Sequence, residues 1–264
     1  MKVSKYKREF EYSYTLGAFP TIELLKNIQT ISEVNIPENR TITIDYKNHV
    51  VKSHKSDVFV NNNGTLTLTD SSETVSGYNT PYDSKVALNN GTLTISKLNF
   101  NILDIGSFID NKGTLTIESG TIKSEGANVS SNLISNSGTL NISGGTYRSW
   151  KNNCYKDYCP ESSNLIQSLG STAVLNITGG RFEKITSGDM ITNSGTMTMT
   201  GGTMNSSCKL QKDWMYCSSN LISNSGDLTI SGVTFSTLGN KHVTQIYSSG
   251  NLTVSDITFT ASSY

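Results

Sequence analysis

The sequence has no excess of either charge, because 21 lysines and arginines balance 21 aspartates and glutamates, and only 16% of the 264 residues are charged. The charge balance therefore gives no reason to expect nucleic acid or an anionic membrane as a partner. No stretch approaches the ~20 consecutive apolar residues of a membrane-spanning helix. The basic start, MKVSKYKREFEYSY, lacks the apolar run of a signal peptide. We therefore expect the chain to be either intracellular or an excised part of a longer protein, and we favour the second, with an extracellular or bacterial cell-surface location.

Catalytic motifs are also missing. The three histidines, His49, His54 and His242, are scattered, and no G-x-S-x-G, H-E-x-x-H or phosphate-binding loop is present. We therefore predict a protein that is not an enzyme and has no metal or cofactor. Apolar residues make up only 35% of the chain, which is low for a compact globule and fits a thin, elongated core.

What the sequence does have is a repeated unit, first visible in the phrase NSGT at residues 136–139 and 193–196. Eight copies of a G-T-L-like motif align on a leucine or methionine, at Leu66, Leu93, Leu115, Leu140, Leu175, Met197, Leu228 and Leu252. The spacing between copies varies from 22 to 35 residues. A minimum spacing with variable excess indicates a fixed unit that is lengthened by loop insertions.

The unit has the period of a β-strand, since in T-L-T-I the aliphatic residues face one side and the threonines the other. One such unit cannot bury its apolar side, whereas a parallel stack of units buries all of them in one core. We therefore predict an all-β protein, a right-handed parallel β-helix (a β-solenoid) of about eight coils of ~22 residues. Residues 1–57 are expected to form an N-terminal cap and the first coil, and residues 58–264 the repeat coils of the same domain.

Two polar columns accompany the repeat. Asparagines occupy the position four residues before the leucine in most copies, as in Asn111, Asn136, Asn193 and Asn224. Glycines occupy the position two residues before it, as in Gly113, Gly138, Gly195 and Gly226. We interpret the asparagines as an internal ladder of side-chain hydrogen bonds. The glycines are expected to form a tight corner with positive φ, so this is a structural corner.

The stretch TIELLKNIQTISEVNIPENRTITIDYKNHVV, followed by VNNNGTLTLTDSS, resembles bacterial secreted and surface β-helix proteins of the adhesin and pectate-lyase-like superfamily. The resemblance covers residues 21–264, and it implies an elongated, extracellular bacterial protein. It does not imply an activity, because such coils are mostly scaffold. Residues 1–20 fall outside the pattern and are expected to be a starting cap or an added extension.

All four cysteines lie in two insertions, RSWKNNCYKDYCPESS and NSSCKLQKDWMYCSSN. By residue count both insertions leave the coil at the same corner, two coils apart. A pair in each loop, Cys154 with Cys159 and Cys208 with Cys217, favours one disulfide per loop. Pairing between the two loops, free thiols and a zinc site are alternatives, although no C-x2-C knuckle is present.

The same insertions hold both tryptophans of the chain. The candidate binding residues are Trp150, Lys151, Tyr155, Tyr158, Lys212, Trp214 and Tyr216, and Lys156 and Lys209 also lie beside these rings. Exposed aromatic rings beside lysines suit sugar stacking or protein recognition, whereas rings that fold back would only cover the coil. We predict a non-catalytic, adhesin-like module at the cell surface or secreted. Its expected partner is a glycan or a surface protein of a host or neighbouring cell, and its oligomeric state is open.

Two alternatives remain. A polysaccharide lyase or hydrolase, phage-derived in one version, would assemble its site across coils from residues such as Asp45, Asp57 or Asp104. A second alternative is ice binding by outward T-x-T pairs such as Thr65 and Thr67, although asparagine, valine and aspartate interrupt this column at several coils.

Overall fold

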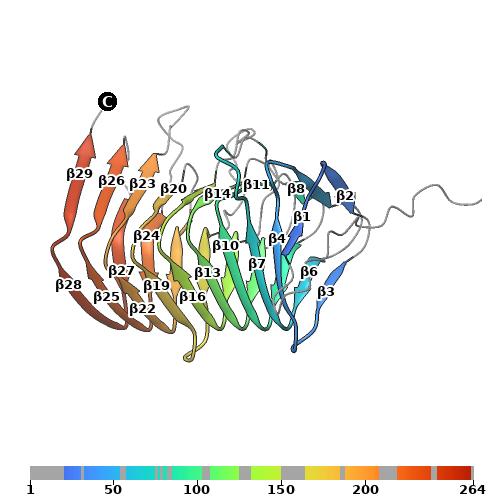
Figure 1. Ribbon diagram of the computed structural model, residues 1–264. Helices are drawn as coiled ribbons and strands as arrows, with labels where there is room; N and C mark the ends of the chain where they lie inside the picture. Colours follow the sequence, from blue (N-terminus) through green and yellow to red (C-terminus); the bar gives the residue numbers. More distant parts are fainter. Residues whose placement is uncertain are drawn as a thin grey trace, which may run out of the picture.

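The computed structural model shows a stack of parallel β-strand coils that runs from the N-terminal strands at one end to the C-terminal strands at the other (Figure 1). Among the described residues the regular structure is all strand, with no helix. The structure describes residues 21–30, 33–53, 58–74, 77, 80–81, 85–102, 108–124, 132–149, 164–184, 188–207, 219–238 and 243–262.

The repeated T-L-T-I segments form one parallel sheet of ten strands, the ten-stranded sheet. Leucine pairs with leucine and threonine with threonine in neighbouring strands, as in Leu93 with Leu115 and Thr94 with Thr116. The strands, in spatial order, are β1 (Thr21–Glu23), β4 (Thr41–Asp45), β7 (Thr65–Thr69), β10 (Thr92–Ser96), β13 (Thr114–Ile117), β16 (Thr139–Ile142), β19 (Val174–Ile177), β22 (Thr196–Met199), β25 (Asp227–Ser231) and β28 (Asn251–Ser255).

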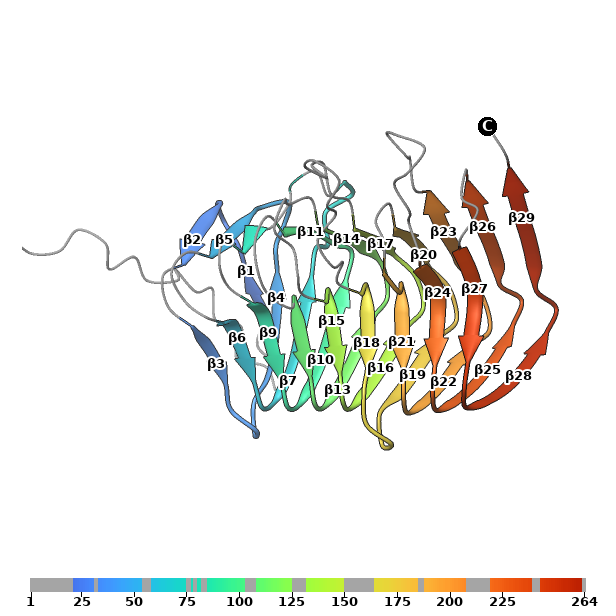
Figure 2. The same cartoon turned by 180° about the vertical axis from the view of Figure 1, so that it is seen from behind.

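The segments that precede each N-x-G phrase form a second parallel sheet, the nine-stranded sheet, whose strands lie side by side in Figure 2. Six of its nine strands end at an asparagine of the asparagine column, in which Asn111 pairs with Asn136. The strands are β3 (Val34–Ile36), β6 (Val58–Asn62), β9 (Lys85–Asn89), β12 (Ile109–Asn111), β15 (Ile134–Asn136), β18 (Ile166–Ser168), β21 (Ile191–Asn193), β24 (Ser219–Asn224) and β27 (Val243–Ser248).

A third side of the coil is the seven-stranded sheet, which starts with β11. It contains a buried column of large residues, Phe100, Ile122, Tyr147, Phe182, Met204 and Phe235. A separate three-stranded sheet occupies this side in the first coils. The strands of the seven-stranded sheet are β11 (Leu98–Ile102), β14 (Gly120–Ser124), β17 (Thr146–Ser149), β20 (Arg181–Lys184), β23 (Thr203–Ser207), β26 (Thr234–Leu238) and β29 (Thr258–Ser262), and those of the three-stranded sheet are β2 (Ile28–Thr30), β5 (Val51–Ser53) and β8 (Thr80–Pro81).

These pairings confirm a parallel β-solenoid, with about seven turns that each give one strand to all three long sheets. The remaining copy of the motif is the first along the chain, at Leu66 in β7. Its turn continues into β8 of the three-stranded sheet instead of into the seven-stranded sheet. This explains why the first copy lacks the large inward residue, most often aromatic, that the later copies have in the seven-stranded sheet. Residues 21–53 join the same sheets as the repeats that follow, and the division of the chain at residue 57 stays a prediction.

The core is the continuous interior that the stacked columns enclose. Leu66, Leu93, Leu115, Leu140 and Leu175 are all fully buried, and the threonines beside them face outward. Tyr147 stacks on Phe182 with ring centroids 4.9 Å apart. The predicted inward and outward sides of T-L-T-I are therefore confirmed, and each rung covers the apolar side of the one before it.

The corner between the nine- and ten-stranded sheets, the asparagine corner, needs glycine for a different reason from the one predicted. Gly113, Gly138, Gly195 and Gly226 are not among the residues with positive φ. A Cβ added to Gly138 would instead lie 2.2 Å from the backbone oxygen of Gly113 in the preceding coil. Close approach of stacked backbones, and not a left-handed conformation, therefore excludes a side chain here.

Positive φ occurs at another corner, where the ten-stranded sheet turns into the seven-stranded sheet. Gly120, Gly145 and Gly180 adopt φ values of 106°, 92° and 105° there. Lys97 and Asp256 take left-handed conformations in the first and last of these turns, one residue before the register position of these glycines. The second glycine of the repeat is thus the one that this backbone geometry requires.

Candidate functional site

The asparagine corner is a continuous hydrogen-bonded ladder. Nδ2 of Asn111 donates to Oδ1 of Asn136 at 2.7 Å, and the same amide donates to the backbone oxygens of Gly113 and Thr139 at 3.2 and 2.9 Å. Asn193 donates to Asn224 in the same way at 2.7 Å. These amides are buried and used by the fold, so the prediction of a structural corner is supported by their geometry.

A turn in the middle of the stack lacks the N-x-G phrase and keeps the ladder by substitution. Ser168 pairs in register with Asn136 and Asn193, and its Oγ accepts from Nδ2 of Asn136 at 3.2 Å. Ala173 takes the place of the corner glycine, since a Cβ on Gly195 would lie 2.2 Å from its backbone oxygen. Sequence alignment on the asparagine alone does not reveal Ser168, because a short insertion separates it from the following strand.

The predicted binding loops leave the coil at the opposite corner, between the seven- and nine-stranded sheets, which we call the insertion corner. The chain leaves β17 at Ser149 and β23 at Ser207. Ser149 pairs with Lys184, and Lys184 pairs with Ser206, so the two exits lie two rungs apart on one edge. The expected common exit point is therefore confirmed.

The loops themselves, residues 150–163 and 208–218, lie outside the described residues. This applies to all the predicted binding and disulfide residues: Trp150, Lys151, Cys154, Tyr155, Tyr158, Cys159, Cys208, Lys212, Trp214, Tyr216 and Cys217. Their roles stay predictions, and the structure bears only on the strands that hold both ends of each loop.

Beneath the insertion corner the interior is polar. The last inward residues of the seven-stranded sheet form one stacked column that is polar and buried in five successive strands, Ser124, Ser149, Lys184, Ser206 and Thr237, and has Ile102 and Ala261 at its two ends. Every other inward column of this sheet is apolar or aromatic. The strands that hold the two loops therefore end in a short polar layer of the interior.

Lys184 lies at the centre of this layer with only 2% of its surface exposed. Its Nζ donates to the backbone oxygen of Asp189 at 2.5 Å, across the short connection between β20 and β21. Burial lowers the pKa of Lys184 to about 7, against the charge of Asp189, which acts to raise it. The amine is consequently close to its titration point at neutral pH.

The returning chain is fixed by a second set of polar contacts. Oδ1 of Asp189 accepts from the backbone N–H and the side-chain amide of Asn220 at 3.1 and 2.8 Å. Oδ1 of Asn132 accepts from the backbone N–H of Asn164 at 3.0 Å. Asn132, Asn164 and Asn220 each belong to a phrase SSNLI, at residues 130–134, 162–166 and 218–222. Our repeat analysis missed this phrase, which marks the point where the chain returns to the coil. Both ends of each long loop are thus held by rigid strands.

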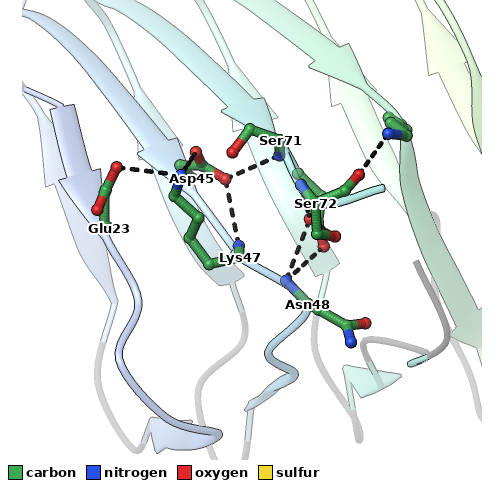
Figure 3. A network of polar contacts seen from close by, with 8 residues as sticks. Glu23, Asp45, Lys47, Asn48, Ser71 and Ser72 are labelled. Atoms are coloured by element: carbon green, nitrogen blue, oxygen red, sulfur yellow. Dashed lines mark hydrogen bonds and ion pairs between the residues drawn. The ribbon is translucent and has the colours of Figure 1, made fainter. Parts of the chain in front are cut away.

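A separate polar network lies near the N-terminal end of the solenoid (Figure 3). Lys47 and Asn48 form a turn with φ values of 46° and 60°. Oδ1 of Asp45 accepts from the backbone N–H groups of Lys47 and Ser71 at 3.2 and 3.0 Å. The carboxylate of Asp70 accepts from the backbone N–H of Asn48 at 3.0 Å. The two buried carboxylates therefore hold an otherwise strained turn.

The ionisation of this network fits a structural role. Burial acts to raise the pKa of Asp45, but hydrogen bonds from Ser71 and Lys47 and the charge of Lys47 outweigh it and lower that pKa. Nζ of Lys47 also lies 3.3 Å from Glu23. Asp45, one of the carboxylates considered for a lyase, is thus occupied by backbone amides. The other two, Asp57 and Asp104, lie outside the described residues.

The outward side of the ten-stranded sheet is a regular polar surface, which we call the threonine face. One of its columns has threonine on eight rungs and asparagine on two, in the order Thr21, Thr43, Thr67, Thr94, Thr116, Asn141, Asn176, Thr198, Thr229 and Thr253. The neighbouring column is Thr41, Thr65, Thr92, Thr114, Thr139, Val174, Thr196, Asp227 and Asn251. Parallel rungs repeat at about 4.8 Å, so the face is a lattice of hydroxyl groups.

Comparison of the chain with protein families, with curated proteins and with solved structures finds no match in any of the three. Within the part of the chain that the structure describes, no group of three or more His, Cys, Asp or Glu side chains is placed to hold a metal ion. The described residues also contain no helix long and apolar enough to cross a membrane.

Proposed function

We propose that this protein is a non-catalytic recognition module, adhesin-like and displayed on a cell surface or secreted. Its two cysteine-containing loops bind a glycan or a surface protein of another cell. The observation that carries this proposal is the position of Ser149 and Ser206, two rungs apart on one edge of a rigid sheet. Two loops that leave the same edge two rungs apart are close enough to form one binding surface.

The composition of the loops supports recognition. They contain both tryptophans of the chain, and their lysines supply polar contacts beside the rings. Rigid aromatic side chains give large contact areas at low entropic cost, and stacking on sugar rings uses the same property. A disulfide in each loop would reduce the ordering cost of binding further. Such disulfides require an oxidising compartment, in agreement with an extracellular location.

A glycan array probed with the complete chain tests this proposal, followed by turnover assays on every glycan that binds. We expect Trp150→Ala and Trp214→Ala each to weaken binding at least tenfold, as for a central aromatic anchor. Tyr247→Ala is the matched control, since Tyr247 is a 56% exposed aromatic residue on the scaffold strand β27. Cleavage of a bound glycan would favour the polysaccharide-degrading alternative instead.

The threonine face supports a second candidate, the binding of ordered water or ice. The supporting observation is the in-register column that keeps threonine or asparagine on all ten rungs. An ice-recrystallisation assay tests it, with Thr116→Lys as the disrupting variant in the middle of the face. If the parent protein does not slow recrystallisation, the face is simply a well-formed solvent-exposed sheet.

A further inference from the structure

The outward side of the seven-stranded sheet carries an unbalanced group of cations. Lys123, Arg148 and Glu183 pair in register on the neighbouring strands β14, β17 and β20. Arg181 lies two residues before Glu183 and therefore on the same side of β20. These four are the only charged residues that the strands of this sheet direct outward, so three cations face one carboxylate. We call Lys123, Arg148 and Arg181 the basic cluster.

The strands of the other two long sheets have no such excess. On the nine-stranded sheet the charged residues are Lys85 and Asp110, which pair with each other. The charged residues of the ten-stranded sheet, Glu23, Asp45 and Asp227, are all acidic. Because the chain as a whole is neutral, the basic cluster is a local concentration of positive charge. Such a concentration attracts ligands of the opposite charge.

The two guanidinium groups are already arranged around an oxyanion. Oε1 of Glu183 accepts from Nε of Arg181 at 2.5 Å, and its Oε2 lies 3.7 Å from Nε of Arg148. One carboxylate is thus shared by two arginines, which restricts both side chains. The side chains of Arg148 and Arg181 are still 34% and 57% exposed, so an anionic group in solvent can reach them.

The rest of this surface suits the hydroxyl groups of a sugar chain. Between and beside the charged residues, the outward positions of β14, β17 and β23 hold only hydroxyl and amide side chains, Thr121, Thr146, Thr203, Asn205 and Ser207. None of them is apolar, whereas the centre of a protein–protein interface is normally apolar and aromatic. Hydroxyl and amide groups both donate and accept hydrogen bonds, as sugar hydroxyls do. The surface therefore favours a glycan over a protein.

The basic cluster adjoins the exits of the two long loops. Arg148 immediately precedes Ser149, where the first loop leaves β17. Glu183 pairs with Asn205 on β23, two residues before the second loop leaves at Ser207. Strands β14, β17, β20 and β23 follow one another along one side of the solenoid (Figure 2). A ligand that the loops hold can therefore lie against these cations.

We propose that the ligand of this protein is an acidic glycan and that the basic cluster binds its carboxylate or sulfate groups. The proposal rests on the proposed function, from which it takes a glycan as the partner, and adds contacts on the scaffold itself. Lys123 and Arg148 are one rung of about 4.8 Å apart, so together with Arg181 they can contact anionic groups along one sugar chain. A neutral glycan would gain nothing from the three cations.

Binding of the complete chain to three immobilised polysaccharides tests the proposal. The probes are hyaluronan, which carries carboxylates only, chondroitin sulfate, which adds sulfates, and neutral dextran. We expect one or both acidic polymers to bind, with an affinity that falls about tenfold or more between about 0.05 and about 0.3 M NaCl, because salt screens exposed charges. Tighter binding of chondroitin sulfate would assign the contact to sulfate groups. A chain that binds neither acidic polymer, or binds dextran equally well, would overturn the proposal.

Two double variants locate the contact. Lys123→Gln with Arg148→Gln should weaken binding of the acidic polymer at least about tenfold, because two charge-assisted contacts are lost. Lys52→Gln with Lys112→Gln removes the same charge at two exposed positions elsewhere on the coil and should leave binding unchanged. Both variants should melt like the parent, since all four positions are at least partly exposed. Equal losses in the two variants, or equally tight binding of duplex DNA, would overturn the proposal, because only total charge would then matter.

The same measurements distinguish this proposal from the proposed function. If the chain binds a neutral glycan, loses it in Trp150→Ala and Trp214→Ala, and keeps it when Lys123 and Arg148 are replaced, the loops are the binding site and the acidic ligand is wrong. If an acidic polymer binds through the basic cluster and both tryptophan variants bind it like the parent, the acidic ligand is right and the role of the loops is wrong.

Discussion

Nζ of Lys184 donates to the backbone oxygen of Asp189 at 2.5 Å, directly across the corner from which the long loops leave one rung before and one rung after. The amine is almost fully buried, and no other lysine or arginine is buried among the residues that the structure describes. This one contact links the stability of the scaffold to pH and lies at the base of the proposed binding surface.

The lowered pKa of Lys184 makes a prediction about stability. Its value in the folded state, about 7, lies below the ordinary 10.5, so between these pH values the unfolded chain binds more protons. Stability should therefore rise with pH over this window, and the full penalty should be present below pH 7. Lys184→Met should remove the penalty and stabilise the protein near pH 6 by on the order of 3 kcal/mol.

Urea unfolding at a series of pH values measures this effect. Lys52→Met, at an exposed position of β5, is the matched control and should leave both stability and its pH dependence unchanged. If Lys184→Met is less stable than the parent at every pH, the hydrogen bond of the amine stabilises the folded state by more than the burial of the amine destabilises it.

A second prediction concerns the asparagine corner. Gly138→Ala should destabilise the protein by about 2–4 kcal/mol, because the new Cβ would lie 2.2 Å from the oxygen of Gly113. The exposed Ser143→Ala, in the same coil, should change stability by less than about 0.5 kcal/mol. Thermal melts of the two variants give the comparison. Equal melting temperatures would mean that the stacked backbones do not approach this closely.

The ladder itself is tested by two adjacent asparagines. Asn89→Asp removes the buried Nδ2 donor that bonds Asn111 and Thr114 and places a carboxylate among backbone oxygens, so a loss of about 3 kcal/mol or more is expected. Asn90→Asp changes an exposed residue and should have little effect. Denaturant midpoints that shift equally in both variants would show that the ladder contributes nothing specific.

The inward and outward sides of the strands are tested by a further pair of variants at neighbouring positions. Ile142→Asp introduces a charge into the fully enclosed core and should destabilise by on the order of 4 kcal/mol or prevent folding. Asn141→Asp lies on the threonine face and keeps the oxygen that accepts from Asn176, so the fold should tolerate it. Circular dichroism during thermal melting separates the two. Similar melting curves would mean that the two sides of T-L-T-I are reversed.

The sequence was sufficient to predict the coils because the same chemistry recurs in every rung, as with Leu93 over Leu115. It located the glycine of the asparagine corner but misassigned its cause, because a close approach of backbones and a positive φ both select glycine. Strand alternation places Lys184 on the same side as Phe182. Its burial was nevertheless not predicted, because a lysine at the end of a strand is normally expected to reach solvent. Asp45 and Asp70 meet across rungs without any motif that joins them.

The central claim is that the two loops at the insertion corner bind the partner and the coils only hold them. The most direct measurement replaces residues 150–160 and 208–217 with three-residue connections as short as the one that links Lys184 to Gly188. Binding to the glycan or protein identified by screening is then compared with binding by the parent chain, alongside circular dichroism and melting. We predict that binding is lost while the variant keeps a β-rich spectrum and a cooperative melt. Full binding by the folded variant would contradict the claim and move the site to the threonine face, and loss of folding would show that the loops are structural covers.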